Sequence, residues 1–332
     1  MDIQEIIANT ADGILVIGSD GAIRYSNEAF ARITGQALSV EDKYIHIMAA
    51  DTDSRNDAFH QVILDAVYHP EQLVKESLSY YRQDGQKLYL QVRAKASEGS
   101  VIFTVTDVTD MEEARLQQRD AALLTAMTIG FFCIWIYITR FWSVFVGQTA
   151  SLSYILSYAL IVLGGVLSFF CIRYTRMSVR NMGLRVQNWR AIIIDSILSA
   201  AFFLLACLVK LIMLRVDPGF FKTEAFLDWS VFAIFSISIY PISVVGQEFL
   251  ARGCIQEGFR IIFKGKHQKL YSLIVSSLFF GALHVHKTLP YMIVTPIFMF
   301  VCGLIYEKQK NIWGICILHY VLLITCKLLG FF

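Results

Sequence analysis

The sequence predicts two fold classes in one chain: an α/β domain built on an antiparallel sheet, then an all-α polytopic membrane domain of about seven transmembrane helices. Hydrophobic residues form 56% of the 332 residues and the mean hydropathy is +0.54, which excludes an ordinary soluble protein. Composition also shifts abruptly near residue 120. Beyond that point, apolar segments approach ~20 residues, the length that crosses a bilayer as a helix.

The part before residue 120 alternates short apolar runs with turns. GILVIGSDGAIRYS predicts two strands around the turn at Asp20 and Gly21, and NEAFARITG predicts a short helix closed by Gly35. A second hairpin, ESLSYYRQDGQKLYLQVRAKA, turns at Asp84 and Gly85. SVIFTVTDVTD supplies the last strand, and the helix MEEARLQQRDAA leads into the first apolar segment.

The apolar segments predict the membrane topology. The expected spans are residues 121–139, 152–172, 191–214, 228–247, 270–288, 290–306 and 312–331. Basic residues gather in the connections after the second, fourth and sixth spans, whereas the first connection holds only Arg140. Because cytoplasmic loops carry the excess of Lys and Arg, we expect a cytoplasmic N-terminal domain and an external C-terminus. The polar opening MDIQEIIANTADG, which is not a signal peptide, fits this orientation.

Charge and cysteine usage exclude several classes. The net charge of +2 gives no reason to expect nucleic acid as a partner. Seven cysteines lie in or beside apolar segments and none forms a CxxC pair, so neither a disulfide framework nor a zinc knuckle is predicted.

Ionisable residues inside the apolar segments are the candidates for function. They are Asp195, Lys210, Glu248, Arg252, His284, His286 and His319. A charge at the centre of a membrane helix costs at least ~2.5 kcal/mol on insertion scales, so each needs an explanation. Asp195 and Lys210 lie near opposite ends of one span, and we expect them to be structural residues that reach the membrane interface.

Glu248 and Arg252 are spaced i, i+4, so they share a helix face and can neutralise one another as a structural ion pair. Gln247 points about 100° away from Glu248, toward a neighbouring helix or a cavity.

The histidines occupy different segments. His284 follows Phe280 by four residues on the same helix face, and His286 is expected at the membrane boundary. His319 is the strongly polar residue at the centre of the last span, where an ordinary structural hydrogen bond is one explanation. If Glu248, His284 and His319 converge, they can activate a water and stabilise an oxyanion, or bind zinc as two histidines and one carboxylate. Spacing alone leaves both alternatives open.

The order DGILVIGSDGAIRYSNEAFARITG, a later hairpin and FTVTDVTDMEEAR resembles a PAS domain over residues 3 to about 112. The resemblance implies that Asp107 and Thr109 end the sheet and start a signalling helix, which passes a conformational or dimerisation signal to the membrane part. Residues 1–120 contain no cysteine, so the light-sensing flavin motif is absent. Among His46, His60 and His69, structural or surface roles are favoured over haem ligation. The PAS ligand is not identified, and an empty, dimerising domain fits as well.

Residues 190–330 resemble the CPBP family, which includes the CAAX-processing endopeptidases of the Rce type and the bacterial abortive-infection proteins. The family motifs appear as Gln247, Glu248, Arg252 and Gly253 for EExxxRG, as Phe280 to His284 for FxxxH, and as FVCGLIYEKQKNIWGICILH ending at His319. The resemblance implies that the tandem glutamates and the second-motif histidine activate water. It also implies that the last histidine and an asparagine four residues later stabilise the oxyanion. A divalent metal such as zinc stays an alternative.

Two positions depart from that pattern. Gln247 replaces the first glutamate, and Leu323 replaces the asparagine. An amide cannot accept a proton at neutral pH, so Gln247 cannot be the general base. Loss of one oxyanion donor slows an enzyme by roughly 10²- to 10³-fold.

The sequence therefore predicts a PAS-regulated membrane endopeptidase of a membrane-proximal peptide, with Glu248 as base and His284 assisting. The alternative is a catalytically inactive sensor or scaffold. Four parts are expected: residues 1–112 (PAS), 113–121 (signalling helix), 122–189 (two transmembrane helices and a basic loop) and 190–332 (CPBP-like). Expected partners are the bilayer, a membrane-associated peptide or protein substrate, and a second copy bound through the PAS domain and signalling helix. The expected location is the bacterial plasma (inner) membrane.

Overall fold

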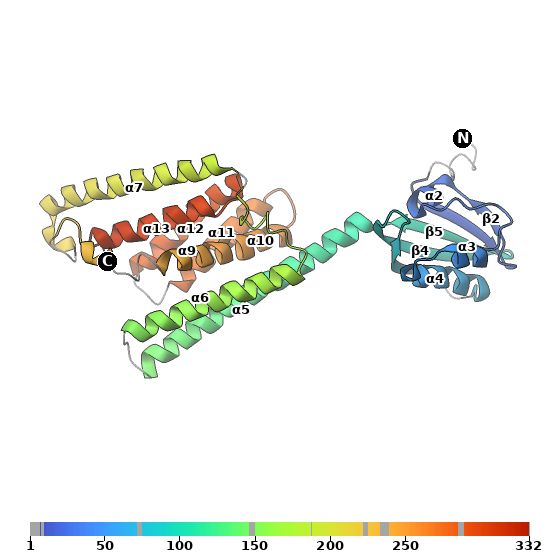
Figure 1. The fold of residues 1–332 in the computed structure, drawn as a ribbon, viewed down its shortest axis with the longest axis horizontal. Coiled ribbons are helices and arrows are strands. Elements are labelled where there is room, and N and C mark those ends of the chain that lie inside the picture. The colour runs from blue at the N-terminus through green and yellow to red at the C-terminus, as the bar shows by residue number, and fades with distance from the viewer. Residues whose placement is uncertain are drawn as a thin grey trace. The chain divides into compact units, whose positions relative to one another are not determined.

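The computed structural model describes residues 7, 10–71, 75–145, 150–186, 188–221, 225–232, 239–284 and 289–331. The chain divides into two compact units, Met1–Arg115 and Leu116–Phe332 (Figure 1). The first unit is α/β and the second is helical. The four-part division expected from the sequence stays a prediction.

The first unit is a five-stranded antiparallel sheet with the strand order β2-β1-β5-β4-β3. Its elements are β1 (Gly13–Gly18), β2 (Ile23–Ser26), α2 (Glu28–Thr34), α3 (Tyr44–Ala50), η1 (Ser54–Asn56), α4 (Asp57–Tyr68), β3 (Lys75–Tyr81), β4 (Lys87–Ser97) and β5 (Ser100–Asp107). Gly21 and Gly85 adopt φ values of 78° and 81°, so both predicted turns use a glycine where other residues would be strained. The predicted fold class of this part is confirmed.

Asn27 joins the first strand to the first helix. Its Oδ1 accepts hydrogen bonds from the backbone amides of Phe30 at 3.0 Å and Ile14 at 2.8 Å, while its Nδ2 donates to the Asp12 carbonyl at 3.0 Å. Asn27 is therefore both the cap of α2 and a connection to β1.

The sheet ends in a single long helix, α5 (Thr109–Phe145). The backbone N–H and the hydroxyl of Thr109 donate to Asp107 Oδ1 at 2.9 and 2.5 Å, and the Tyr89 amide donates to Thr109 Oγ1 at 2.9 Å. These bonds anchor the first turn of α5 to β4. Asp107 and Thr109 thus end the sheet and start the helix, as the PAS resemblance implies.

The second unit consists of helices. Besides α5 they are α6 (Ala150–Tyr174), α7 (Trp189–Val216), η2 (Pro218–Phe220), η3 (Trp229–Phe232), α9 (Tyr240–Glu248), η4 (Phe249–Gln256), α10 (Glu257–Ile262), α11 (Gln268–Leu283), α12 (Leu289–Gln309) and α13 (Trp313–Leu328). Within the described residues, three segments are long and apolar enough to cross a membrane: Thr109–Trp142, Trp189–Val216 and Met292–Gln309. Three shorter apolar helices accompany them. Several apolar helices are therefore present, and the count of seven spans stays a prediction.

The fourth predicted span, 228–247, includes residues 233–238, which lie outside the described residues, so its limits stay a prediction. Asp228 starts a local turn by accepting hydrogen bonds from the backbone and hydroxyl of Ser230, and α9 begins at Tyr240. It then continues through η4 and α10 to Ile262, because the polar residues that follow Glu248 are paired inside the unit. The segment GQEFLARG therefore lies in the middle of a helix rather than at its end. His286 falls in residues 285–288, outside the described residues.

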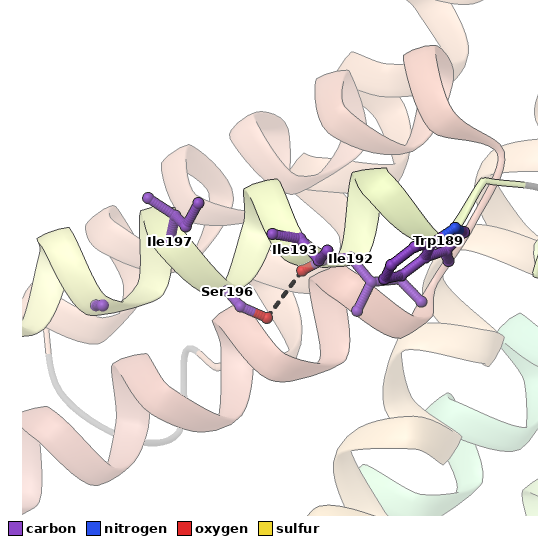
Figure 2. A pocket seen from close by; sticks show the side chains of 6 residues that line it. Trp189, Ile192, Ile193, Ser196 and Ile197 are labelled. Carbon is purple, nitrogen blue, oxygen red and sulfur yellow. Dashed lines mark hydrogen bonds between the residues drawn. The ribbon is translucent and has the colours of Figure 1, made fainter.

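One face of α7 is apolar and open. A shallow hollow of about 360 Å³ is lined by Trp189, Ile192, Ile193, Ser196, Ile197 and Ala200. Figure 2 shows these side chains. The one hydroxyl in the hollow, that of Ser196, donates to the Ile192 carbonyl of its own helix at 2.8 Å. The lining offers no group for chemistry and suits contact with lipid.

Two polar residues of α7 differ from the expectation, because Asp195 and Lys210 are fully buried instead of reaching the interface. Asp195 Oδ1 accepts a hydrogen bond from Gln309 Nε2 at 2.9 Å, and Lys210 Nζ donates to the Ala225 carbonyl at 2.7 Å. Both lie near the ends of their span, but helix packing and a loop cover them. A Cβ added to Gly314 would lie 2.0 Å from Asp195 Oδ2, so α13 meets this carboxyl group through a glycine.

We therefore expect Gly314→Ala to destabilise the helical unit by about 1–3 kcal/mol through overpacking against Asp195. Gly165→Ala, a control on α6 with nothing within 4 Å of the added methyl group, should be neutral or slightly stabilising. Thermal unfolding of the detergent-solubilised full chain measures both. Equal melting temperatures for the two variants would contradict the close contact.

Candidate active site

The candidate site is built on an irregular stretch of helix. Gln247 and Glu248 close α9, and Arg252 and Gly253 follow in η4, an eight-residue π-helical segment whose residues are all buried. π-Helical turns are rare and frequent at functional sites. A Cβ on Gly253 would lie 2.9 Å from the Met182 carbonyl oxygen, so this glycine lets the loop after α6 pack against the helix.

Glu248 lies at the centre of the site and is completely buried. Its Oε2 accepts a hydrogen bond from Arg252 Nε at 3.1 Å, and its Oε1 lies 2.6 Å from His319 Nδ1. The first contact is the ion pair expected from the i, i+4 spacing. The second joins α9 to α13, so the structure brings two of the three proposed catalytic side chains into direct contact.

His319 is the partly exposed member of this pair. Its side chain is 16% exposed, whereas that of Glu248 is 0% exposed. The imidazole packs edge-on against Phe298, with ring centres 5.4 Å apart. Because Nδ1 faces Glu248, Nε2 is the ring atom available to a substrate.

Arg252 is held at all three nitrogens of its guanidinium group. Besides Nε, its Nη1 donates to Gln256 Oε1 at 3.0 Å and its Nη2 contacts Met299 Sδ at 3.3 Å. Gln256 in turn donates from Nε2 to the Gly303 carbonyl at 3.2 Å and to Glu307 Oε1 at 3.3 Å. Sequence reasoning missed Gln256 and Glu307. Gln256 could have been found from its spacing, because it follows Arg252 by four residues, just as Arg252 follows Glu248.

Gln247 and Leu323, the two departures from the family pattern, take local roles. The Gln247 amide donates to the Ser243 hydroxyl at 3.0 Å, a bond within α9. Leu323 lies on α13 one turn after His319 and has no polar atom to offer.

His284 caps the end of α11, and its Nδ1 lies 2.8 Å from the Phe280 carbonyl of the same helix. Within the described residues, no group of three or more His, Cys, Asp or Glu side chains is close enough to hold a metal ion. The structure therefore does not gather Glu248, His284 and His319 into the two-histidine, one-carboxylate zinc site considered from the sequence.

A second buried charge cluster follows directly after η4. Glu257 is fully buried and pairs with Arg260 and with Lys310, whose Nζ lies 3.0 Å from Glu257 Oε2. Lys310 also pairs with Glu307 at 3.1 Å. Two acidic and two basic side chains thus balance one another and continue the polar chain that begins at Glu248.

Helix α5 packs against η4 and α10, the helical segment that includes Arg252 and Gly253. Thr125 Oγ1 donates to the Cys254 carbonyl at 3.3 Å, and a Cβ on Gly258 would lie 1.9 Å from that hydroxyl. Gln118 Nε2 donates to the Ile262 carbonyl at 2.9 Å. The helix that starts at the end of the sheet therefore contacts η4 and α10 directly.

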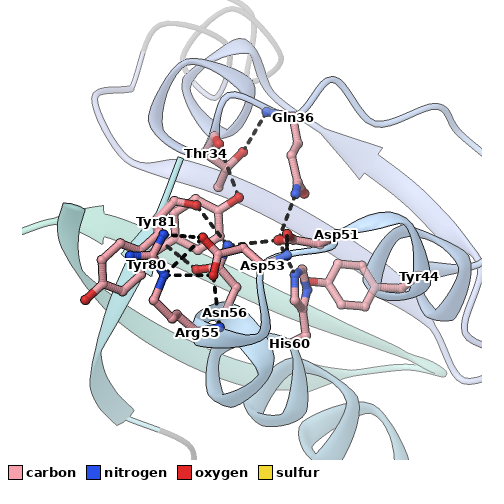
Figure 3. Close-up of polar contacts among 10 residues, drawn as sticks. All are labelled: Thr34, Gln36, Tyr44, Asp51, Asp53, Arg55, Asn56, His60, Tyr80 and Tyr81. Carbon is pink, nitrogen blue, oxygen red and sulfur yellow. Dashed lines mark hydrogen bonds and ion pairs between the residues drawn. The ribbon is translucent and has the colours of Figure 1, made fainter. Parts of the chain in front are cut away.

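In the first unit, Figure 3 shows His60 between Tyr44 and Asp51. His60 is 1% exposed, with Nδ1 2.9 Å from the Tyr44 hydroxyl and Nε2 3.0 Å from Asp51 Oδ2. Burial favours the neutral form of Asp51, but hydrogen bonds from His60 and Asn56 outweigh it and lower the pKa of this carboxyl group. His46 and His69 are exposed surface residues.

Comparisons with known proteins agree with this two-part organisation. A model of the PAS fold matches residues 2–108, and the model "Type II CAAX prenyl endopeptidase Rce1-like" matches residues 228–324. The search of curated proteins gave no match.

Similar solved structures are PAS and light-oxygen-voltage (LOV) domains. An RNA-binding light-oxygen-voltage receptor is 20% identical over 33% of this chain, with a TM-score of 0.27, and the chain covers 33% of its length. A sensor histidine kinase/response regulator domain from Geobacter sulfurreducens is 16% identical (31% of this chain, 90% of that chain, TM-score 0.25). The LOV domain of a blue-light activated histidine kinase from Erythrobacter litoralis EL346 is 15% identical (30% and 99%, TM-score 0.25).

The antiparallel α/β unit precedes a helical unit in which Glu248 contacts Arg252 and His319. The chain therefore combines a PAS domain at residues 2–108 with an Rce1-like CAAX protease domain at residues 228–324.

Proposed function

We propose that this PAS-linked, membrane protease-like protein is an endopeptidase that hydrolyses a membrane-proximal peptide bond. The observation that supports this most is the 2.6 Å contact between Glu248 Oε1 and His319 Nδ1, which joins a fully buried carboxylate to a partly exposed imidazole. A histidine oriented by a carboxylate is an effective general base near neutral pH.

The geometry favours an exchange of the roles expected from the sequence. Both oxygens of Glu248 already accept hydrogen bonds, and no part of it is exposed, so it suits orientation better than proton abstraction. Glu248 then holds the Nδ1–H tautomer of His319, and Arg252 compensates the buried negative charge. The assisting role of His284 is not needed for this arrangement.

The proposed reaction begins when His319 Nε2 removes a proton from water as the water oxygen attacks the peptide carbonyl carbon. The tetrahedral intermediate then collapses, the C–N bond breaks, and His319 returns the proton to the leaving nitrogen. The products are a carboxylate and an amine. Leu323 supplies no oxyanion donor, so we expect a slow enzyme.

The PAS domain would regulate this site through α5. The support is the contact of Thr125 with the Cys254 carbonyl and the close approach of Gly258, which place α5 against the motif-bearing helix. We also propose the arrangement predicted from the sequence. The PAS domain is cytoplasmic, the C-terminus is external, the membrane is a bacterial plasma membrane, and two copies form a homodimer through the PAS domain and α5.

A second candidate is a catalytically inactive sensor or scaffold. It is favoured by the saturation of Glu248, whose oxygens face Arg252 and His319, and by the bond of Gln247 within its own helix. In this case the buried polar chain only stabilises the helical unit.

Removal of either member of the pair should abolish most of the turnover. In nanodiscs, with membrane-anchored peptides whose C-terminal cysteine is prenylated or free, Glu248→Gln and His319→Asn should each lower kcat by about 10²- to 10⁴-fold. The double variant should be no slower than the worse single one, because the two act as a unit. His267→Asn, an exposed histidine outside the site, is the control. Unchanged turnover in Glu248→Gln would rule out the assignment.

Restoration of the family residues should increase the rate. Leu323→Asn, one turn after His319, should raise kcat by roughly 10²- to 10³-fold if it supplies the missing oxyanion donor, and Gln247→Glu tests the second base. The same peptide assay measures both variants. If neither the wild type nor the variant that combines Gln247→Glu with Leu323→Asn cleaves the peptides, the scaffold function is favoured.

Perturbation of the α5 contact should alter the rate without touching the site. Thr125→Val removes the hydrogen bond to the Cys254 carbonyl at nearly constant shape, and Gly258→Ala forces α5 away from the helix. We expect a several-fold change in kcat, larger for Gly258→Ala, of the size typical of coupling energies near 1–3 kcal/mol. Gly130→Ala, on α5 with nothing within 4 Å, is the control. Equal rates in all three variants would leave α5 without a regulatory role.

A further inference from the structure

We propose that Gln256 is a positioning residue for the reaction, because it fixes the guanidinium of Arg252, which in turn orients Glu248 and His319. This inference rests on the proposed function. Its support is an unbroken series of contacts from Glu307 to His319, with donor–acceptor distances of 3.3, 3.0, 3.1 and 2.6 Å.

Both ends of the Gln256 amide are used. The oxygen accepts from Arg252 Nη1, while the nitrogen donates to the Gly303 carbonyl at 3.2 Å and to Glu307 Oε1 at 3.3 Å. A glutamate at position 256 would keep the acceptor for Arg252 but would face a carbonyl and a carboxylate without a proton to donate. A methionine of similar length would offer Arg252 only a weakly accepting sulfur and would leave the Gly303 carbonyl and Glu307 Oε1 without a donor. The surroundings therefore select an amide.

Because the site is buried, replacement of the Gln256 amide by another group is costly. Gln256 and Arg252 are both 0% exposed, so water cannot replace a lost hydrogen bond. The contact also requires Gly303 on α12. A Cβ there would lie 2.9 Å from Gln256 Oε1 and 3.1 Å from Arg252 Nη1, so any side chain would press on both groups.

The hydrogen bond from Arg252 to Gln256 affects the orientation of the side chains at the site. Arg252 donates to Glu248 through Nε, and rotation of the guanidinium about that contact is restrained by the hydrogen bond of Nη1 to Gln256 and by the weaker contact of Nη2 with Met299 Sδ. Rotation moves Glu248 Oε2 and, through the rigid carboxylate plane, Oε1, which contacts His319 Nδ1. A small misplacement of a catalytic group can lower the rate by about 100-fold.

The test compares Gln256→Met with Gln309→Met. Gln309 is a glutamine of the same unit whose amide donates to Asp195 instead of to the site, so it controls for the substitution. For the full chain in nanodiscs, Gln256→Met should lower kcat by up to about 100-fold with KM little changed. Gln256→Glu should also be slow. Gln309→Met should keep the wild-type kcat.

A second readout does not depend on activity. The ¹⁵N shifts of the His319 ring should report the Nδ1–H tautomer in the wild type and in Gln309→Met, and a tautomer mixture in Gln256→Met. If the wild type cleaves no peptide, the proposed function fails while this spectrum still decides the role of Gln256. An unchanged His319 spectrum in Gln256→Met would overturn the inference.

If Gln256→Met does not fold, a pair at Glu307 replaces it. Glu307→Gln and Glu307→Leu both remove the charge that faces Lys310, but only the glutamine retains an acceptor for Gln256 Nε2. We expect Glu307→Leu to shift the His319 tautomer toward a mixture and to lower kcat, by less than Gln256→Met does, while Glu307→Gln stays near the wild type on both readouts. Identical behaviour of the two variants would contradict the role of Gln256.

Discussion

The helical unit depends on one constraint: a carboxylate and a guanidinium are buried together in a largely apolar interior. Removal of one partner from a buried ion pair typically costs about 3–5 kcal/mol, because the other charge is left uncompensated. Glu248 and Arg252 satisfy this constraint locally, at 3.1 Å. Their remaining hydrogen-bonding groups require further partners, and these come from α12 and α13 as well as from η4.

Several backbone features follow from that requirement. The π-helical conformation of η4 keeps Arg252 and Gln256 buried on the helix that carries Glu248. Gly303 lets α12 approach the two polar groups, and Gly253 lets the loop after α6 pack on the same helix. Beyond Gln256, Glu307 belongs to a balanced cluster with Glu257, Arg260 and Lys310. The unit therefore contains a continuous polar chain inside apolar packing.

The two domains are joined by a helix with defined contacts at its beginning and along its length. Thr109 binds Asp107 and the Tyr89 amide, so the first turn of α5 is tied to the sheet. Farther along, Thr125 contacts η4. In the PAS domain, the buried Asp51, His60 and Tyr44 network fills the space beside α4 with polar side chains that satisfy one another. This network favours a structural role for His60 over ligand binding.

Local pattern was enough to predict the strands, the two glycine turns and the pairing of Glu248 with Arg252, because each depends on residues close in sequence. The same i, i+4 spacing also relates Gln256 to Arg252. The helix start at Asp107 and Thr109 came from the PAS resemblance. Hydropathy could not predict the burial of Asp195, since neither an apolar count nor a distance from a span end reports which helices cover a residue. The contact of Glu248 with His319 joins residues 71 positions apart. Only tertiary packing decided that contact, and with it which histidine the carboxylate meets.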